Sequence, residues 1–248
     1  MERHHFEAEL RELRECVARM GDLVCARLEA CLRALAGRDC DAARFVVGHD
    51  EEINAIQIEI DERALRILAL QQPAAVDLRF VTATVKANAD LERIGDQAVN
   101  VAGAALQVIG RPALACEPMV AEMGWNALSM VKDALASFLG RDASQARSVL
   151  ARDDEIDAMK RRVLRDLIAV MTRDPGTIEP AISLVFISRH FERVADHATN
   201  MAEDAIFVVE AKDVRHGHEE GIRLQVAGNR LPGTANGQQP AADGAGET

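Results

Sequence analysis

The sequence predicts an all-α fold in which an internal duplication produces two tandem three-helix bundles from six long antiparallel helices. The composition is the first reason: aromatic residues make up 3 % of the chain and Tyr is absent, which favours helices over sheets. The second is that long stretches with apolar residues at helical spacing end at Gly or Pro. The third is that short motifs recur in the same order in both halves.

The helices follow from these breakers and from the apolar spacing. The first helix should end with a glycine cap at Gly37, the second before Pro73 and the fourth at Gly140. Asp174 or Thr177 should cap the start of the sixth helix. Short turns between long helices require neighbouring helices to pack antiparallel. The predicted ranges are 6–36, 39–72, 73–109, 117–139, 142–172 and 177–212.

The duplication is visible as two series of matching residues. Met20-Gly21 recurs as Met123-Gly124, 103 residues further along, whereas residues 90–100 recur as 190–200, 100 residues further along. The change of offset places a three-residue deletion at the turn between the last two helices of the second copy. We therefore expect a first three-helix repeat over residues 1–112, a second over 113–212, and a disordered Gly/Pro-rich tail over 213–248.

Charge and composition also exclude some classes of function. The formal net charge of −11 disfavours nucleic-acid partners, because an acidic surface repels phosphate backbones. The five cysteines form no Cys-x-x-Cys pair, which is typical of reduced core residues. The chain starts without a signal peptide and contains no apolar run long enough to span a membrane. We expect a cytoplasmic protein.

An acidic row on the third helix, repeated on the sixth, is the motif that indicates chemistry. Its pattern is Glu-Arg-x-x-Asp-x-x-x-Asn, and residues at i, i+4 and i+8 share one stripe of a helix. Further acidic or amide side chains, also four residues apart, lie on the second and fifth helices and would face these rows. The predicted metal ligands are Asp50, Asn54, Glu92, Asp96 and Asn100 in the first repeat and Asp153, Asp157, Glu192, Asp196 and Asn200 in the second.

Crowded carboxylates predict a cation because their mutual repulsion raises their pKa values unless a multivalent ion neutralises them. Ligand sets made of oxygen alone suit hard ions such as Mg²⁺, Mn²⁺ or oxidised iron. The alternative is a solvated acidic face paired with Arg93 and Arg193. Recurrence of the rows in both copies favours a site. A purely structural protein without metal is a third possibility, and a chelator would not affect it.

Three segments carry a resemblance to the PhoU family of phosphate-specific transport accessory proteins. They are QQPAAVDLRF at 71–80, DLERIGDQAVN at 90–100 and FERVADHATNMAED at 191–204, with the acidic pairs near Asp50 and Asp153. The resemblance spans residues 6–212. It implies two three-helix bundles, multinuclear iron or zinc clusters on the acidic rows, and negative regulation of the phosphate-starvation response. It also implies a homodimer, and contacts with the phosphate transporter's ATPase subunit and a sensor histidine kinase.

The first repeat departs from the second at two positions. Asn54 stands where the second repeat has Asp157, and Gly103 stands where it has Glu203. The first site is therefore expected to bind metal more weakly than the second.

The expected function is a metal-binding regulatory adaptor with no catalytic and no cofactor-binding residues, because no nucleophile–base pair, phosphate loop or nucleotide motif is present. The alternative is a metal-dependent helical-bundle enzyme that hydrolyses nucleotides or phosphates. Enzymes of that type use acidic residues three apart, a spacing found at Glu9, Glu12 and Glu15. These residues lie away from the repeated rows.

Overall fold

The computed structural model of this protein describes residues 2–48 and 51–215, and their secondary structure confirms the all-α class. Every long element is an α-helix, and one short 3₁₀ helix precedes the last of them. The elements are α1 (Glu2–Gly37), α2 (Cys40–Val47), α3 (Glu51–Gln71), α4 (Ala75–Ile109), α5 (Glu117–Gly140), α6 (Ala143–Leu150), α7 (Asp153–Arg173), η1 (Pro175–Thr177) and α8 (Ile178–Glu210).

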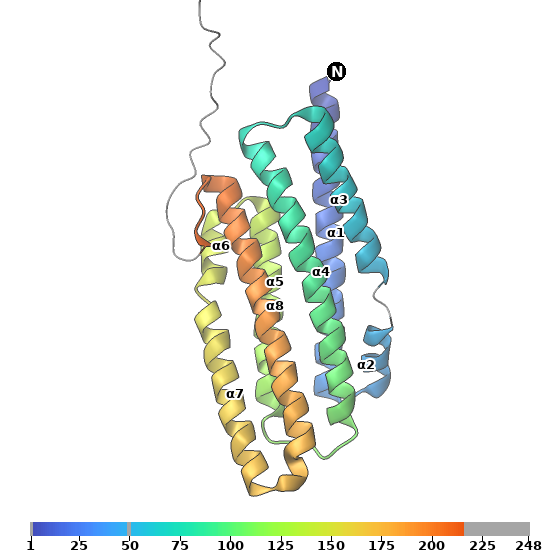
Figure 1. Ribbon diagram of the computed structural model, residues 1–248, viewed down its shortest axis with the longest axis vertical. Helices are drawn as coiled ribbons and strands as arrows, with labels where there is room; N and C mark the ends of the chain where they lie inside the picture. Colours follow the sequence, from blue (N-terminus) through green and yellow to red (C-terminus); the bar gives the residue numbers. More distant parts are fainter. Residues whose placement is uncertain (1, 49–50, 216–248) are drawn as a thin grey trace, which may run out of the picture.

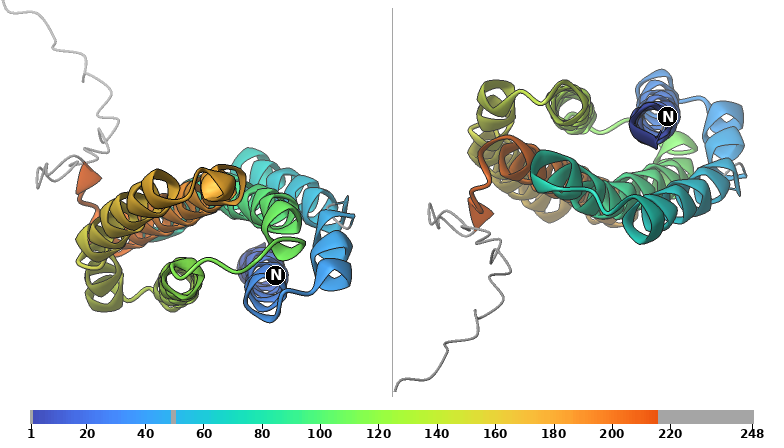
Figure 2. Two further views of the ribbon diagram at one scale, coloured as in Figure 1. Left: turned by 90° about the horizontal axis from the view of Figure 1, so that it is seen from below. Right: turned by 90° about the horizontal axis from the view of Figure 1, so that it is seen from above.

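The helices form two three-helix units that lie side by side. In the first unit α1 packs against α3 and α4, with α2 continuing the line of α3, and in the second α5 packs against α7 and α8, with α6 before α7. The units meet where α4 packs against α8 and α1 against α5. Seen along the long axis, α3, α4, α8 and α7 form one layer and α2, α1, α5 and α6 the other (Figure 2). The predicted pair of three-helix bundles is confirmed.

The second and fifth predicted helices are each divided in two, so their prediction as single helices was wrong. In the second repeat the division is the turn at Ala151 and Arg152, between α6 and α7. Arg152 holds this turn through hydrogen bonds from its guanidinium group to the Asp133 carboxylate (2.8 Å) and the Asn126 carbonyl (3.3 Å). Gly48, after α2, is the equivalent of Ala151 in the first repeat. The first helical segment therefore ends at the equivalent position in both repeats.

The turns that follow α1 and α5 depart from the predicted glycine caps by one residue. Gly37 and Gly140 remain helical, and the next residues, Arg38 (φ 54°) and Arg141 (φ 55°), adopt the left-handed backbone. This conformation costs a non-glycine residue roughly 1 kcal/mol, so contacts elsewhere in the fold must offset that cost. The helices that follow start as predicted, because Asp39 and Asp142 each accept two backbone N–H groups as N-caps.

The remaining N-cap expectation concerns the start of the sixth helix. Asp174 caps the 3₁₀ turn η1 by accepting the Gly176 N–H at 2.9 Å, whereas the Thr177 side chain makes no capping hydrogen bond. The cap of this region is therefore Asp174.

One hydrophobic core runs through both units. Helices α1 and α5 approach each other closely in this core, since a side chain on Gly21 would clash with Leu135 and one on Gly124 would clash with Leu32. The two clashes are equivalent under the repeat. The recurring Met-Gly pair is therefore explained by the packing of the two units against each other.

The cysteines belong to this core. Cys16, Cys25, Cys31 and Cys116 are buried, Cys40 is half-buried, and all five are free thiols. Burial raises the pKa of Cys25 to about 11 and also raises the pKa values of Cys16 and Cys116. Since the thiolate is the reactive form, these side chains act as apolar packing.

The C-terminal end of the described region and the character of its helices bear on the remaining sequence expectations. Val214 packs against the core and the Arg215 guanidinium pairs with the Asp213 carboxylate, so ordered contacts continue just past residue 212. The rest of the expected tail, from 216 on, lies outside the described residues. None of the described helices combines the length and the apolar character needed to cross a membrane.

Candidate metal centre

The structure brings four of the predicted ligands of the second repeat together between α7 and α8. Asp153 begins α7, Asp157 lies one turn later, and Glu192 and Asp196 lie one turn apart on α8. Desolvation raises the pKa of Asp153, and the charges of Asp157, Asp154 and Glu192 raise it further. These four carboxylates therefore act on one another as a cluster.

Asp196 shows the same effect from the α8 side. Its side chain is exposed as a whole, yet desolvation of its carboxyl group is the largest cause that raises its pKa, followed by the charges of Glu192 and Asp153. The imidazole of His197 partly offsets this rise in pKa. A charge that is destabilised in this way favours either a proton or a cation.

Two basic side chains of α7, which sequence reasoning missed, reach into the same cluster. The Lys160 ammonium group donates a hydrogen bond to the Glu192 carboxylate, and Arg161 Nη1 lies 3.7 Å from Asp157 Oδ2. The Asp157–Arg161 pair has the i, i+4 spacing that could have indicated it. The equivalent residues of the first repeat are the neutral Gln57 and Ile58. The second repeat thus supplies part of its own counter-charge, whereas the first has no basic residue at these two positions.

In the first repeat, two of the described ligands are carboxylates, and both lie on α4. Glu92 and Asp96 lie one turn apart on α4, and the Arg93 guanidinium lies 3.5 Å from Glu92 Oε2 and 3.9 Å from Asp96 Oδ2. Asn54 on α3 and Asn100 on α4 are exposed. Asp50 lies outside the described residues. The structure therefore describes the α4 half of this predicted site in full and, from the α3 half, Asn54 alone.

Asn200 is turned away from the carboxylate cluster and toward the first repeat. Its side-chain amide donates to Asp90 Oδ1 of α4 at 3.2 Å, and His197 Nδ1 lies 2.8 Å from the same oxygen. Across the same interface, His190 Nδ1 lies 2.8 Å from Gln97 Oε1. Under the repeat, Asp90 is equivalent to His190 and Gln97 to His197. These polar pairs therefore join α4 to α8 about the pseudo-two-fold relation of the two units.

The negative charge and the oxygen atoms of these four side chains suit a hard cation, but the side chains are not arranged around a common point. The second repeat presents four carboxylates that repel one another, which a divalent ion would relieve. However, within residues 2–48 and 51–215, no three His, Cys, Asp or Glu side chains are arranged to hold a metal ion. Lys160 already binds Glu192 Oε1 and would compete with a metal ion for that carboxylate. Any metal would then be held by Asp153, Asp157, Glu192 and Asp196.

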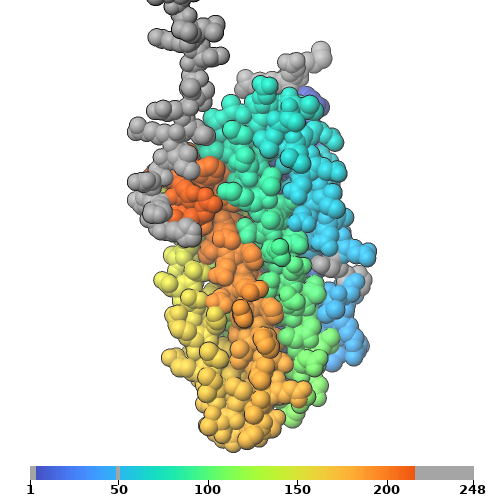
Figure 3. All heavy atoms as spheres, viewed as in Figure 1, coloured from blue at the N-terminus to red at the C-terminus, as the bar shows by residue number. Residues whose placement is uncertain are grey.

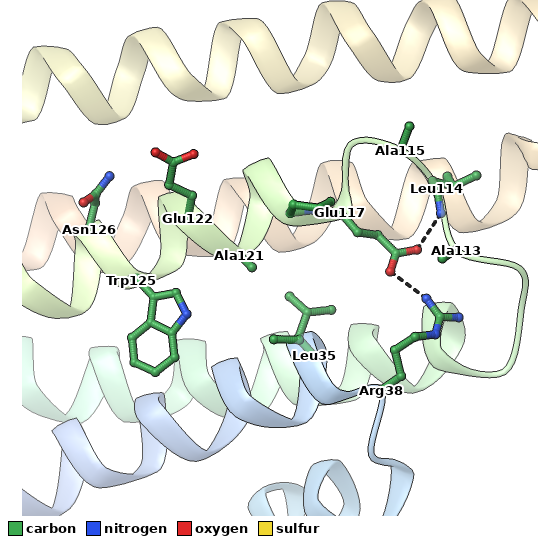
Figure 4. Close-up of a pocket in the computed structure, with 12 residues that line it drawn as sticks. Leu35, Arg38, Ala113, Leu114, Ala115, Glu117, Ala121, Glu122, Trp125 and Asn126 are labelled. Atoms are coloured by element: carbon green, nitrogen blue, oxygen red, sulfur yellow. Dashed lines mark hydrogen bonds and ion pairs between the residues drawn. The ribbon is translucent and has the colours of Figure 1, made fainter.

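Two other places were candidates for a functional site. A groove of about 660 Å³ between α1 and α5 has mostly apolar walls, with Leu35 and Trp125 facing it and the Arg38–Glu117 ion pair at one end (Figure 4). The acidic row on α1 is partly paired, since Glu12 binds Arg63 of α3 at 2.6 Å and Glu9 lies 3.5 Å from His5. Neither place collects carboxylates as the α7–α8 cluster does.

Comparison with known proteins identifies the family of this fold. The sequence model of the PhoU domain matches the chain twice, over residues 17–105 and 120–205, once in each helical unit. The chain belongs to the PhoU family. A similar protein of Pseudomonas putida, a phosphate-specific transport system accessory protein PhoU homolog, is 38% identical over 240 residues, which cover 92% of this chain and 91% of that protein.

Solved PhoU structures share the whole architecture. The crystal structure of PhoU from Pseudomonas aeruginosa superposes with a TM-score of 0.79 at 37% identity and covers 82% of this chain and 98% of that one. The phosphate transport system regulatory protein PhoU from Streptococcus pneumoniae superposes with a TM-score of 0.78 at 32% identity, covering 84% and 99%. This chain is therefore a PhoU-family protein similar to accessory and regulatory proteins of phosphate transport over its full helical region.

Proposed function

We propose that this protein is an accessory and regulatory component of phosphate transport that restrains the phosphate-starvation response when phosphate is plentiful. The observation that carries the proposal is the match of both helical units, over nearly the whole length of the relatives, to phosphate-specific transport accessory proteins. Its partners would be the ATPase subunit of the phosphate transporter and a sensor histidine kinase. A protein with these partners would work in the cytoplasm and contact the membrane through them.

The proposed mechanism uses the acidic rows as metal-dependent parts of a binding surface. The helices that carry them, α3 with α4 and α7 with α8, lie side by side on one face (Figure 3). The mutual repulsion of these carboxylates supports cation binding. A bound ion would allow the acidic patch to bind acidic groups of a partner protein. Iron, zinc, manganese and magnesium are all compatible with the oxygen donors.

Deleting the gene tests the regulatory role. Transcription from a phosphate-responsive promoter should rise in phosphate-rich medium and return to the parental level when the wild-type gene is restored. Restoring the Asp96→Ala/Asp196→Ala double variant should return it only in part, provided that the variant protein accumulates normally. Unchanged transcription in the deletion strain would contradict the proposal.

Metal content tests the acidic rows directly. Protein purified without a metal-binding tag should contain iron, zinc or manganese by elemental analysis, and the double variant should lose it. Lys160→Gln copies the residue of the first repeat and removes the charge that competes for Glu192. We expect it to raise the metal occupancy of the second repeat by about tenfold at limiting metal, since a charge-assisted hydrogen bond no longer has to be broken. Equal occupancy in wild type and Lys160→Gln would exclude this competition.

The relative strength of the two sites can be separated by a further variant. The first repeat has one carboxylate fewer, with Asn54 in place of Asp157, and is proposed to bind metal more weakly. In a Glu192→Ala variant the remaining metal should therefore be well below full occupancy. Near-complete occupancy of the first site would contradict the proposal. Light scattering on the same samples tests the proposed homodimer, for which a single species of about 27 kDa would be the contrary result.

A further inference from the structure

The two ends of the α1–α5 helix pair are equivalent under the internal repeat but carry different charges. At one end Arg38 follows α1 and Glu117 begins α5; at the other, Arg141 follows α5, and Arg14 on α1 occupies the position equivalent to Glu117. The offset of 103 residues relates Arg38 to Arg141 and also Arg14 to Glu117. An arginine thus stands at the second end where the first end has a carboxylate.

At the first end, both terminal nitrogens of the Arg38 guanidinium have hydrogen-bond acceptors. Arg38 Nη1 lies 2.6 Å from Glu117 Oε2, and Arg38 Nη2 donates to the carbonyl oxygens of Val108 and Ile109, each at 2.9 Å, and to that of Arg111. Figure 4 shows the Glu117 carboxylate between the Arg38 guanidinium and the backbone N–H of Leu114. Both terminal nitrogens of the Arg38 guanidinium are therefore hydrogen-bonded.

At the second end the equivalent donors lack acceptors. Arg14 and Arg141 both lie over the ring of Phe80, with their guanidinium carbons 4.8 Å and 5.3 Å from its centre. Arg14 Nε, Arg141 Nε and Arg141 Nη2 are buried and have no hydrogen-bond partner among residues 2–48 and 51–215. Asp77 Oδ1 lies 3.6 Å from Arg141 Nη2, which is within ion-pair range but too far for a hydrogen bond. The Val208 carbonyl, equivalent to that of Val108, is taken by Arg79 Nε at 3.1 Å.

Two guanidinium groups that share one carboxylate leave an uncompensated positive charge. Desolvation lowers the pKa of Arg14, and repulsion from Arg141 lowers it further, against a smaller opposing effect of Asp77. Buried donors without acceptors are uncommon in folded proteins and indicate a missing partner. The chain as a whole is strongly acidic, with a formal net charge of −11, so this excess of positive charge is opposite in sign to the charge of the molecule.

We infer that Arg14 and Arg141 bind a tetrahedral oxyanion of the inorganic phosphate type, which takes the place that the Glu117 carboxylate holds at the other end. An anion with oxygen atoms on several sides can accept hydrogen bonds from two guanidinium groups at once, one on α1 and one directly after α5. A single carboxylate pairs its two oxygens with the parallel N–H groups of only one guanidinium. The site opens to solvent, because the Arg141 side chain is 29% exposed and that of Asp77 is 39% exposed. The site lies where α4 begins and α5 ends, because Asp77 is in the first turn of α4 and Arg141 directly follows α5; Figure 1 shows both helix ends at the same end of the molecule.

Titration of the purified full-length chain with inorganic phosphate tests this site. Heat of binding and the melting temperature should both show a saturable effect in wild type that sodium chloride at the same ionic strength does not reproduce. Arg14→Gln should weaken phosphate binding by about tenfold or more, as expected for losing a charge-assisted contact. Arg14→Glu should abolish it and raise the melting temperature without phosphate, because it rebuilds the ion pair seen at Arg38 and Glu117.

The control is Arg173→Glu, which makes the same change of charge at an exposed position in the last turn of α7. It should leave phosphate binding unchanged. Sulfate binding comparable to phosphate binding would support the tetrahedral oxyanion class, whereas acetate binding as tight as phosphate would overturn it. The inference also fails if phosphate has no saturable effect on wild type, or an equal effect on wild type and Arg14→Glu. This test is independent of metal content and of transcription, so it can fail while the proposed function stands.

Discussion

At the scale of single residues, ionised carboxylates of the α7–α8 cluster lower the stability of the metal-free folded protein. Desolvation and the neighbouring charges of Glu192 and Asp153 raise the pKa of Asp196. The folded state therefore binds a proton at this carboxyl more tightly than the unfolded state does, and ionisation costs stability as the pH rises through the folded-state pKa. Such a cost is typical of sites that await a cation.

We predict that Asp196→Asn stabilises the metal-free protein at pH 7 by roughly 0.5 kcal/mol, a small value because the side chain is exposed. The gain should vanish below pH 3.8, the ordinary pKa of aspartate, where both states are protonated. With saturating Mn²⁺ the order should reverse, because only wild type retains the ligand. Urea unfolding at several pH values measures this. Asp22→Asn, which neutralises an exposed carboxylate on α1, is the control, and equal effects of the two substitutions would contradict the prediction.

His190 leads to a second prediction, in which stability changes with pH in the opposite direction. Desolvation, followed by repulsion from Arg193 and Arg189, lowers its pKa below the ordinary 6.5. The unfolded state therefore binds the proton first, so this contribution to stability is complete above pH 6.5 and is lost as the pH falls from 6.5 through the folded-state pKa.

We expect His190→Gln, which can keep a hydrogen bond to Gln97, to reduce the loss of stability between pH 7 and pH 5. The quantity to measure is the difference in unfolding free energy between wild type and variant at each pH. That difference should shift in favour of the variant as the pH falls, by up to about 1 kcal/mol. Parallel pH profiles of the two proteins would show that His190 does not titrate differently on folding.

Residue spacing grouped the carboxylates of the α7–α8 cluster but did not predict the basic side chains, Lys160 and Arg161, that contact them. The i, i+4 rule places Asp153 with Asp157 and Glu192 with Asp196 because it depends only on the geometry of one helix. The bond between Lys160 and Glu192 depends on the register between α7 and α8, which no local pattern contains. For the same reason the stripe rule grouped Asn200 with Asp196, whereas packing of α8 against α4 turns it to Asp90.

At the scale of elements, two glycines in the helices that join the two units have different roles. A side chain on Gly124 of α5 would clash with Leu32 of α1 and with Phe191 of α8. Gly103 in α4 has no neighbouring atom within 4 Å of where a Cβ would lie. The first glycine is therefore required by helix contact, whereas the second only adds flexibility to the helix.

We predict opposite effects of alanine at these positions. Gly124→Ala should lower the unfolding free energy by about 1–3 kcal/mol, because a tight helix contact must open. Gly103→Ala should raise it by about 0.5–1 kcal/mol, since alanine is the better helix former and meets no atom. Chemical denaturation of the two variants under the same conditions decides this. Stabilisation by both substitutions would mean that α1 and α5 can separate at no cost.

The divided helices show the limit of element prediction from one sequence. Ala151 and Arg152 are good helix formers, so the periodic pattern runs through them without a stop. The break depends on Arg152 finding Asp133 and the Asn126 carbonyl on α5, which is tertiary structure. By contrast, Asp39 and Asp142 mark helix starts through contacts within three residues, and those starts were predicted.

At the scale of the whole molecule, the duplicated units share one core and do not form two independent domains. Buried residues of α1, α4, α5 and α8 form a single contiguous cluster, and polar pairs such as Asp90 with His197 close the α4–α8 interface. Separating the units would expose this apolar surface to water. The two repeats should therefore unfold together, although each is matched separately by the family model.

The single tryptophan, Trp125, allows this cooperativity to be measured, because it lies on α5 in the second repeat. Ile67→Ala removes a side chain that is 1% exposed on α3 of the first repeat, and should cost about 2–5 kcal/mol. If the shared core makes unfolding a single step, the urea midpoints from Trp125 fluorescence and from far-ultraviolet circular dichroism should coincide in wild type and fall together in the variant. A variant whose circular dichroism becomes biphasic while the fluorescence midpoint of Trp125 stays in place would establish two independent units, and the α4–α8 and α1–α5 contacts would then contribute little to stability.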